Sequence, residues 1–370
     1  MTQSSEWPNV QSLSYPAPPK PSEEVHPWAR NFEQATRRGD AVIRALAEHK
    51  KAGLEPDVIL SHPGWGDAFF VRDYFPGAKV IGYFEYYYQA RGADVGFDPE
   101  FPSALNDIFR LHAQNATQLL ALQSCDHGIC PTEWQRSVFP SEYSDKLAVH
   151  HEGIDTDVAK PDAAAMFSLP DGRQLTRENE VLTYVSRGLE PYRGFHIFMR
   201  ALPRILRERP ECQVLIIGED KTTYGRAPRD GGTWKAWMQR ELGTSLDWSR
   251  VHFTGRLAYP DFLSALQISS AHVYLTYPFV LSWSMLEAMS CGCAIVASDT
   301  APVREFVQDG VHAQLFPFRD HQRLADLVIE TLRAPSSQAS LRQAARQQIL
   351  DRLDFKTVSL PAYLKLLDIA

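Results

Sequence analysis

The sequence predicts an α/β protein with two doubly wound domains, each a parallel sheet covered by helices, that face each other across a cleft. Three observations predict it. Short apolar runs alternate with segments of helical spacing along most of the chain, which is typical of parallel sheets buried on both faces. A polar stretch at residues 156–180 divides this pattern into two halves. The length of 370 residues is sufficient for two domains of ordinary size.

Composition and charge place the chain among soluble globular proteins, with 44% hydrophobic and 22% charged residues. The net charge of -7 disfavours general nucleic-acid binding. No apolar run reaches about 18 residues, so we expect no membrane-spanning helix. The N-terminus lacks the basic-then-apolar pattern of a signal peptide.

The five cysteines have no CxxC spacing, which indicates reduced thiols in a cytosolic protein. Cys291 and Cys293 lie in an apolar stretch. We therefore expect them to pack in the core, although metal binding is the alternative.

The first half is predicted to form a domain over residues 1–156, in which residues 1–35 are an extended, proline-rich lead-in. A helix is expected over 104–124, with Leu105, Ile108, Phe109, Leu119 and Leu120 on its apolar side. The other expected elements are helices over 36–52 and 132–139 and strands over 57–60, 79–88, 128–130 and 146–150.

The second half is predicted to form a domain over residues 157–346, after the polar linker. A final segment, 347–370, is expected to be helical and to pack back on the first domain. The expected strands are 181–186, 213–218, 251–255, 272–277, 294–298 and 313–316, and the expected helices lie near 194–208, 233–242, 259–268 and 282–291.

Ligands of open α/β sheets bind beyond the carboxyl ends of the strands, so the loops there are the candidate sites. The first such loop is SHPGWGDAFF (61–70). Gly64, Trp65 and Gly66 follow a strand and suit close backbone approach to a phosphate or sugar, but a plain Pro-Gly turn fits equally well. His62 is either a site residue or a packed or capping histidine. Phe69 replaces the third glycine of the dinucleotide fingerprint, which disfavours a nicotinamide dehydrogenase.

The second loop is YFEYYY (83–88), in which Glu85 leaves a strand end among tyrosines. Aromatic side chains suit the flat faces of sugars, and they are also common in plain packing. We expect Glu85 to act in the cleft as a hydrogen-bond acceptor or as an acid of shifted pKa. Packing is the alternative.

The third loop is VSRGLEPYRGF (185–195), in which Arg187 ends a strand and Arg193 comes just before a helix. Two fixed cations at such a turn can hold a diphosphate, because arginine binds phosphate with bidentate geometry. Their charge would also stabilise a departing phosphate. The alternative is a pair of solvated surface arginines.

The fourth loop opens the stretch PFVLSWSMLEAMSCGCAIVASD (278–299). We expect the backbone N–H groups of Val280, Leu281 and Ser282 to be free for an anion, with Ser282 as the helix N-cap. Glu287 follows one to two turns later, on the face that carries Ser284. A carboxylate accepts two hydroxyl donors, so a vicinal diol such as a ribose fits it. A structural ion pair with an arginine is the alternative.

These residues together resemble the retaining glycosyltransferase family 4, whose GT-B fold has two Rossmann-like domains. That family has a strand-end arginine, a basic residue six positions on, and a Glu-x7-Glu motif opening a helix. LEAMSCGCAIVASD is similar to the segment that follows this motif. CPTEWQRSVF (130–139), with Arg136, and HEGIDT (151–156) resemble segments of the family's first domain and domain junction.

The resemblance implies a glycosyltransferase that uses a nucleoside-diphosphate sugar, retains configuration, and needs neither metal nor cofactor. It implies that Arg187 and Arg193 grip the diphosphate, that Glu287 holds the ribose, and that Gly255 and Arg256 lie near the base. The partners would be a nucleotide sugar and a carbohydrate, lipid-linked or other hydroxyl acceptor in polysaccharide or glycoconjugate synthesis. The expected location is cytoplasmic, with peripheral membrane association as a second option.

The chain departs from the family pattern at three places. Phe279 stands where the first glutamate of Glu-x7-Glu would fall, and Glu85 stands near the position of a family histidine. Residues 1–35 contain no strand with a glycine loop, so we expect the first domain to lack its first strand or strands. These departures leave a catalytically inactive nucleotide-sugar-binding or assembly module as the alternative. A metal-dependent enzyme using Asp155 and Asp157, and a sugar-nucleotide epimerase, are weaker alternatives.

Overall fold

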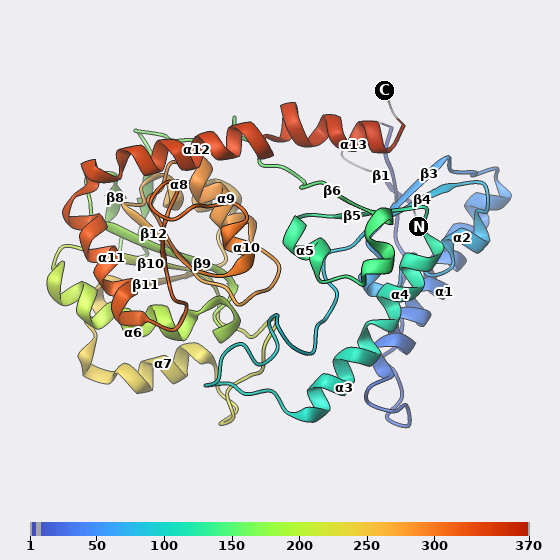
Figure 1. Ribbon diagram of the computed structural model, residues 1–370, viewed down its shortest axis with the longest axis horizontal. Helices are drawn as coiled ribbons and strands as arrows, with labels where there is room; N and C mark the ends of the chain where they lie inside the picture. The colour runs from blue at the N-terminus through green and yellow to red at the C-terminus, as the bar shows by residue number, and fades with distance from the viewer. Residues whose placement is uncertain (1, 5–8, 369–370) are drawn as a thin grey trace. The chain divides into compact units, whose positions relative to one another are not determined.

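The computed structural model describes residues 2–4 and 9–368, with side chains from residue 9 onward. The chain forms two compact units, which we describe one at a time (Figure 1). The first unit contains the described residues of Met1–His151 and Leu366–Ala370. The second unit is Glu152–Lys365.

The sheet of the first unit has four parallel strands in chain order: β3 (Val58–Ser61), β4 (Lys79–Tyr83), β5 (His127–Cys130) and β6 (Leu147–Val149). The predicted strands are therefore present. The order of these strands does not reverse within the described sheet, which agrees with the expectation that the first domain lacks its first strand or strands.

Strand β4 ends at Tyr83, so the expected strand over residues 79–88 is too long. A side chain of the later helix α5 (Glu133–Ser137) binds the chain here, because Gln135 Nε2 donates to the Glu85 carbonyl at 2.6 Å. The backbone of Glu85 is thus bonded outside the sheet, and Glu85 lies just beyond the carboxyl end of the strand.

The helices of the first unit cover this sheet, and α1 starts at Arg30 instead of residue 36. A short antiparallel pair, β1 (Thr2–Ser4) and β2 (Gln11–Leu13), precedes them. The helices are α1 (Arg30–Lys51), α2 (Val71–Tyr74), α3 (Leu105–Gln114), α4 (Ala116–Ser124) and α5 (Glu133–Ser137), with 3-10 turns η1 (Pro63–Trp65) and η2 (Ser141–Lys146).

The expected single helix over residues 104–124 is broken at Asn115, which is 3% exposed. Its side chain donates to the Tyr88 carbonyl at 2.8 Å and accepts from the Tyr88 N–H at 3.0 Å. The break changes which side chains face the core. The predicted apolar side is wrong for Leu105, Phe109, Leu119 and Leu120, which are exposed, whereas Leu111, Ala121 and Leu122 are buried.

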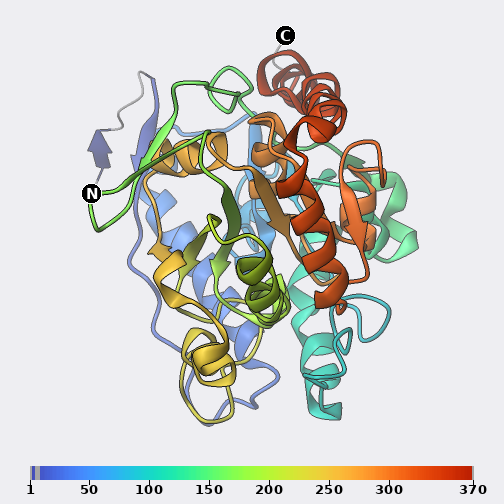
Figure 2. The same cartoon turned by 90° about the vertical axis from the view of Figure 1, so that its left-hand side faces the viewer.

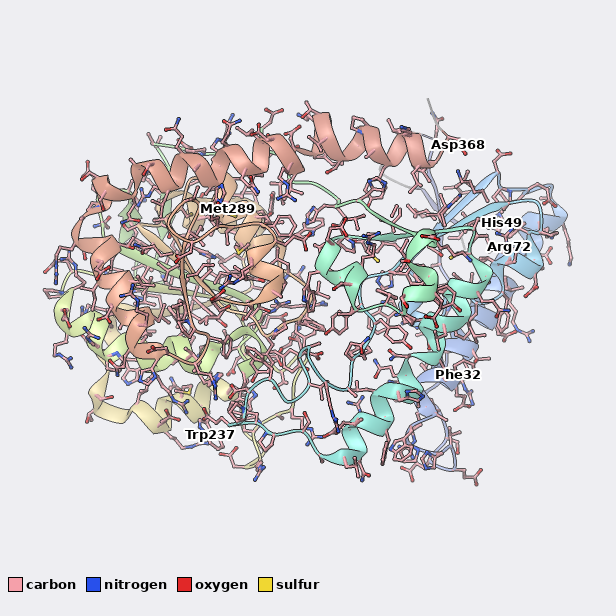
Figure 3. The ribbon with its side chains drawn as sticks, in the orientation of Figure 1. Phe32, His49, Arg72, Trp237, Met289 and Asp368 are labelled. Carbon is pink, nitrogen blue, oxygen red and sulfur yellow. The ribbon has the colours of Figure 1, made fainter. Side chains whose placement is uncertain are left out.

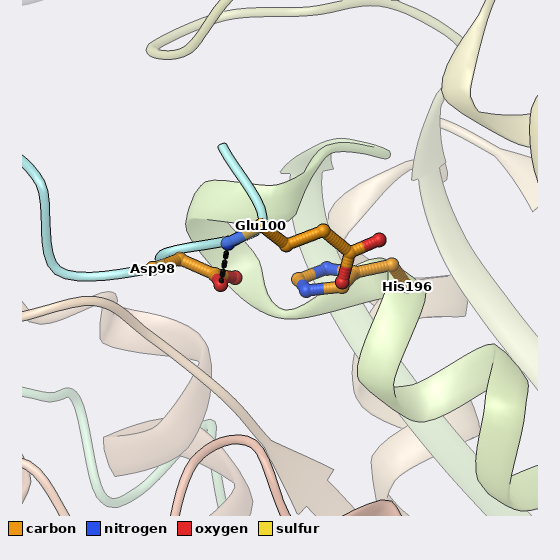
Figure 4. Close-up of side chains that lie close together, drawn as sticks. All are labelled: Asp98, Glu100 and His196. Carbon is orange, nitrogen blue, oxygen red and sulfur yellow. Dashed lines mark hydrogen bonds between the residues drawn. The ribbon is translucent and has the colours of Figure 1, made fainter. Parts of the chain in front are cut away.

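Polar side chains also fix the connections of the first unit. Arg72 on α2 donates to the carbonyls of Ala78 at 2.9 Å and Ser124 at 3.1 Å and pairs with Asp126 (Figure 3). In the long segment between β4 and α3, Asp94 accepts a hydrogen bond of 2.7 Å from Tyr86. Asp98 accepts one of 3.1 Å from the N–H of Glu100 (Figure 4). Hydrogen bonds to carboxylates of the segment itself therefore stabilise its conformation.

The sheet of the second unit is parallel and doubly wound, with the order β11-β10-β9-β12-β13-β14. The order reverses between β9 and β12, which are adjacent. All six predicted strands are present, as β9 (Val181–Gly188), β10 (Gln213–Glu219), β11 (Val251–Gly255), β12 (Ala271–Tyr274), β13 (Ile295–Ser298) and β14 (Gln314–Phe316).

Helices cover both faces of this sheet (Figures 1 and 2). On one face α6 (Phe195–Glu208) packs against α11 (His321–Arg333). On the other face α8 (Tyr259–Gln267), α9 (Trp283–Ser290) and α12 (Ala339–Leu353) share one apolar core. Met289 of α9, labelled in Figure 3, is fully buried in that core. The remaining helices are α7 (Trp234–Leu242), α10 (Ala301–Arg304) and α13 (Leu360–Leu366).

The expected linker over residues 156–180 is part of the second unit. It contains an antiparallel pair, β7 (Met166–Ser168) and β8 (Gln174–Thr176). Phe167 and Leu175 from this pair are buried in a core cluster with Val181 and Leu215 of the main sheet. The polar composition reflects the exposed face of the pair, so composition alone misassigns the segment.

The last helices mostly belong to the second unit too. The Ile154 N–H donates to the Leu353 carbonyl at 2.7 Å, and the Phe355 N–H donates to the Ile154 carbonyl at 2.9 Å. In the first unit, Lys79 binds the Leu366 carbonyl at 2.9 Å. We therefore correct the expected 347–370 boundary: the chain changes units at Leu366.

All five cysteines are buried and none forms a disulfide, as predicted. Among the described residues, no helix has both the length and the apolar character that crossing a bilayer requires.

Candidate functional site

The point where the strand order reverses brings two of the predicted loops to neighbouring strand ends. Arg187 is next to last in β9, and Arg193 follows in the turn η3 (Pro191–Arg193). The predicted loop that begins at residue 278 follows β12 (Ala271–Tyr274), with Thr276 between the two. In doubly wound sheets this position is the usual ligand site.

Arg193 is a buried cation with neutral partners, at 5% exposure. Its Nη1 donates to Thr276 Oγ1 at 2.7 Å and to the Tyr274 hydroxyl at 3.3 Å. Its guanidinium carbon lies 5.3 Å from the centre of the Tyr224 ring and 5.8 Å from that of Phe279. Within the described part of the chain, no carboxylate pairs with it. A buried charge without a counter-ion is costly, so this arrangement suits an anionic ligand.

The turn that carries Arg193 is fixed from several sides. The Tyr184 hydroxyl donates to the Arg193 carbonyl at 2.6 Å, and the Tyr277 N–H donates to the Tyr192 carbonyl at 3.0 Å. Gly194 has φ 64°, and a Cβ there would lie 2.4 Å from Leu275 Cβ. Only glycine fits this position, so the backbone places Arg193 rigidly.

Arg187 differs from Arg193 because it is exposed. It lies near the carboxyl ends of β10 and β11. The pKa of Glu219 is lowered first by its hydrogen bond with Lys221, then by the charge of that lysine, and further by the charges of Arg256 and Arg187. Gly255 ends β11 with φ 68°. Arg187, Arg256 and Gly255 therefore lie at the same edge of one sheet.

The N-terminus of α9 confirms one prediction and corrects another. Ser282 is the N-cap, and its Oγ accepts from the Ser284 N–H at 3.3 Å and lies 3.0 Å from Ser284 Oγ. However, the Ser282 N–H donates to the Tyr274 hydroxyl at 2.8 Å, so it is not free for an anion. Val280 is partly buried and Leu281 is 6% exposed.

Glu287 has a partner that the sequence did not predict. It is 7% exposed, and its Oε1 accepts a hydrogen bond of 2.9 Å from the hydroxyl of Tyr259, in the first turn of α8. Burial raises the pKa of Glu287, and the bond from Tyr259 opposes that shift. No arginine pairs with it among the residues that the structure describes, so the ion-pair alternative is not supported.

Phe279 occupies the position of the missing glutamate and packs as an aromatic core residue, 6% exposed. Its ring lies 5.1 Å from that of Tyr224 and 5.5 Å from that of Tyr192. The sequence also did not predict Tyr224 or the hydroxyls of Tyr274 and Thr276. Only their positions at or after the carboxyl ends of β10 and β12 could have indicated them.

The first unit brings His62 and Glu85 together. They follow neighbouring strands, β3 and β4, and His62 Nε2 lies 3.2 Å from Glu85 Oε2. Both side chains are partly exposed. Beside them, the buried atoms His62 Nδ1, Tyr83 Oη and Gln118 Oε1 have no hydrogen-bond partner within the described chain. Buried polar atoms are nearly always satisfied, so water or a ligand is expected there.

The rest of the SHPGWG loop has mixed roles. Trp65 is 63% exposed, and its ring centre lies 6.4 Å from that of His62. Gly66 has φ 92°, and a Cβ there would lie 2.3 Å from the Ala35 carbonyl oxygen, so packing against α1 explains this glycine. A Cβ at Gly64 would lie 3.0 Å from the His62 ring.

Three further residues considered in the sequence bind partners of their own. Arg136 on α5 pairs with Glu133 at 2.9 Å, on a helix capped by Thr132. Asp157 pairs with Lys356, and Asp155 accepts hydrogen bonds from the N–H groups of Asp157 and Val158. The Asp155 and Asp157 carboxylates thus bind different partners, which does not fit a shared metal.

Comparison with known proteins assigns both halves of the chain. Residues 1–159 match the model of a glycosyl transferase family 4 group, and residues 171–348 match that of the glycosyl transferases group 1. A phosphatidyl-myo-inositol mannosyltransferase from Mycolicibacterium smegmatis is 26% identical over an alignment of 284 residues, and the match covers 68% of this chain and 69% of the relative. A glycogen synthase from Mycobacterium tuberculosis is 28% identical over 214 residues, 58% of this chain and 46% of the relative.

Solved structures share the fold at lower identity. Sucrose-phosphate synthase from Thermosynechococcus elongatus has a TM-score of 0.72 at 18% identity, covering 100% of this chain and 86% of that one. HepE from Anabaena has a TM-score of 0.64 at 18% identity, and the match covers 87% of this chain and 81% of HepE. With both of its halves matched by glycosyltransferase models and its fold found in GT-B enzymes, the chain belongs to the family 4, group 1 glycosyltransferases.

Proposed function

We propose that the protein transfers a sugar from a nucleoside-diphosphate sugar to a hydroxyl acceptor, with retention of configuration and without a metal ion. The observation that carries this proposal is Arg193, a buried guanidinium whose partners among the described residues are neutral hydroxyls and aromatic rings. A diphosphate would supply the missing negative charge. Arg187 would add a second, solvent-facing cation at the same sheet edge.

In this proposal Glu287 holds the ribose of the donor. The carboxylate uses one oxygen for Tyr259 at 2.9 Å, and it can accept a hydroxyl at the other. Ser284 lies one turn away on the same helix. Gly255 and Arg256 come at the end of β11, shortly before the Tyr259 that bonds to Glu287, and they would face the base. Relatives include an enzyme named as GDP-mannose-dependent, which makes a guanine nucleotide one candidate donor.

The first unit would receive the acceptor. Glu85 would accept a hydrogen bond from the acceptor hydroxyl, and His62 would orient Glu85 at 3.2 Å. The exposed indole of Trp65 offers a flat apolar surface to a sugar ring. The acceptor oxygen bonds to the anomeric carbon and gives its proton to Glu85, while the bond to the diphosphate breaks and the diphosphate leaves with that electron pair. Arg193 and Arg187 stabilise the departing charge.

The test is ligand-dependent thermal unfolding with UDP, GDP, ADP, TDP and CMP, in the wild type and in Glu287→Ala. A ligand at 100 times its dissociation constant stabilises the folded state by about 2.7 kcal/mol. We expect one diphosphate to raise the unfolding temperature of the wild type and to lose most of that effect in the variant.

Absence of any shift in the wild type would refute the donor site. A shift without sugar transfer to any of a panel of saccharide and lipid-linked acceptors would instead indicate a binding or assembly module. Transfer that stops with a metal chelator would refute the metal-free part of the proposal.

A further inference from the structure

Glu190 is a fully buried carboxylate that lies between Arg187 and Arg193 in the sequence and pairs with neither. Its Oε1 accepts hydrogen bonds from the N–H groups of Thr223 at 2.9 Å and Tyr224 at 3.0 Å. Its Oε2 accepts from the Gly225 N–H at 2.7 Å, and the Thr223 hydroxyl also donates to Oε1. All of these donors belong to one loop, residues 220–233, between β10 and α7.

The loop and the turn before Arg193 fit closely. A Cβ at Gly188 would lie 2.5 Å from the Lys221 carbonyl oxygen. A Cβ at Gly225 would lie 3.1 Å from Glu190 Oε2 and 3.1 Å from the Tyr192 ring. Glycine on both sides of the contact therefore lets the backbone N–H groups reach the carboxylate, which indicates one defined position for the loop.

This contact brings the loop to Arg193 through Tyr224. The Tyr224 ring centre lies 5.3 Å from the Arg193 guanidinium and 5.1 Å from the ring of Phe279, which itself lies 5.8 Å from the guanidinium. Two aromatic rings from different segments therefore border the cation. Ring contacts of this kind stabilise a guanidinium without neutralising it.

We infer that Glu190 is a positioning residue for the anion site. Its carboxylate binds the 220–233 loop in a position where the Tyr224 ring contacts Arg193. Because backbone N–H groups occupy this carboxylate, Glu190 does not pair with Arg193, and the positive charge of Arg193 remains available to the ligand. This inference rests on the proposed function, since it assumes that Arg193 binds the diphosphate. A site fixed before the ligand arrives loses less entropy on binding.

The test uses inorganic pyrophosphate as the probe and titration calorimetry on the full chain. Glu190→Gln keeps the size of the side chain but turns one acceptor into a donor that faces N–H groups. We expect pyrophosphate to bind roughly tenfold more weakly to this variant. Tyr224→Ala, at a side chain that is 38% exposed, should weaken binding comparably with little effect on folding.

A double-mutant cycle separates positioning from a general loss of stability. If Glu190 acts through the loop, the double variant will lose less pyrophosphate binding free energy than the sum of the losses in Glu190→Gln and Tyr224→Ala. Two unrelated defects would give the full sum. Trypsin provides an independent readout, because Lys221, Arg226 and Arg229 lie in the loop. We expect faster cleavage at these residues in Glu190→Gln than in the wild type.

The matched control is Asp354→Asn. Asp354 is also a buried carboxylate, 8% exposed, that accepts from the N–H and hydroxyl of Thr357 at 2.8 and 2.7 Å. This variant should lower thermal stability without changing pyrophosphate affinity or loop cleavage. Equal or tighter pyrophosphate binding by Glu190→Gln would overturn the inference and leave the diphosphate site intact. Failure of the wild type to bind pyrophosphate would refute the proposed function itself.

Discussion

The hydroxyl of Tyr259 donates a hydrogen bond of 2.9 Å to the carboxylate of Glu287. Among the described residues, this neutral bond is the partner found for the one charged side chain of α9. A neutral donor compensates only part of the cost of burying a charge. The ionised form of Glu287 therefore depends on a further hydroxyl donor, which the ribose of a nucleotide would supply.

The first prediction concerns pH. Burial raises the pKa of Glu287 above its ordinary value, so the folded protein holds a proton that the unfolded chain releases. The free energy of unfolding should therefore fall as pH rises from the ordinary pKa of a glutamate, about 4.3, through the raised value. Glu287→Gln lacks this titration, so we expect it to gain stability relative to the wild type over that window. Urea unfolding of both proteins from about pH 4 to about pH 8 measures the difference.

Tyr259→Phe is the control for this prediction. It removes the bond that opposes the pKa shift, so the fall in stability should extend to higher pH. If the difference between the wild type and Glu287→Gln did not depend on pH, Glu287 would not titrate in this window.

The second prediction concerns the buried charge of Arg193. Burying an ion costs several kcal/mol, and Arg193 has only neutral hydroxyl partners among the described residues to compensate that cost. We expect Arg193→Met to unfold at the same temperature as the wild type or higher without ligand, and to lose stabilisation by pyrophosphate. Calorimetric scans with and without pyrophosphate test both parts.

Arg187→Met is the matched control for Arg193→Met. Arg187 is exposed, so its replacement should leave thermal stability unchanged while weakening pyrophosphate binding. A marked loss of stability in Arg193→Met would mean that the guanidinium stabilises the turn, which would favour a structural role over anion binding.

The third prediction separates the first unit from donor binding. Glu85→Gln should lower the rate of sugar transfer by about 100-fold, which is the lower end of the usual rate contribution of a general acid or base. Nucleotide affinity should stay the same, because the candidate diphosphate residues are in the second unit. Single-turnover rates and nucleotide titrations distinguish the two effects. Glu55→Gln, at an exposed residue before β3, is the control and should change neither quantity.

Much of this architecture could be predicted because apolar runs and strand-end positions are local properties of the sequence. The strands of both sheets, the N-cap at Ser282 and the position of Arg193 before α6 all follow from such patterns. The errors arise where a contact with a residue distant in the sequence determines the local backbone conformation. Asn115 binds the backbone of Tyr88 and breaks a helix that its own neighbours favour.

The candidate site shows the same limit. The sequence indicated Glu287, Arg187 and Arg193, because each lies near a strand end or helix start. It did not indicate Tyr259, which lies 28 positions from Glu287, or Tyr274, which accepts from both Arg193 and the Ser282 N–H. Such pairs form only when the sheet order places two loops side by side.

The last prediction concerns the glycine that follows Arg193. Gly194 and Gly310 both have positive φ, 64° and 71°, but Gly194 is crowded and Gly310 is not, since a Cβ at Gly194 would lie 2.4 Å from Leu275 Cβ and one at Gly310 would meet nothing within 4 Å. Gly310→Ala should cost roughly 1–2 kcal/mol for the positive-φ backbone alone. Gly194→Ala adds a steric clash of about 1–3 kcal/mol. It should also displace the Arg193 carbonyl from Tyr184 and weaken pyrophosphate binding, which Gly310→Ala should not do. Equal costs in urea unfolding would show that Leu275 yields to the added methyl group, and unchanged pyrophosphate affinity would show that the turn does not set the position of Arg193.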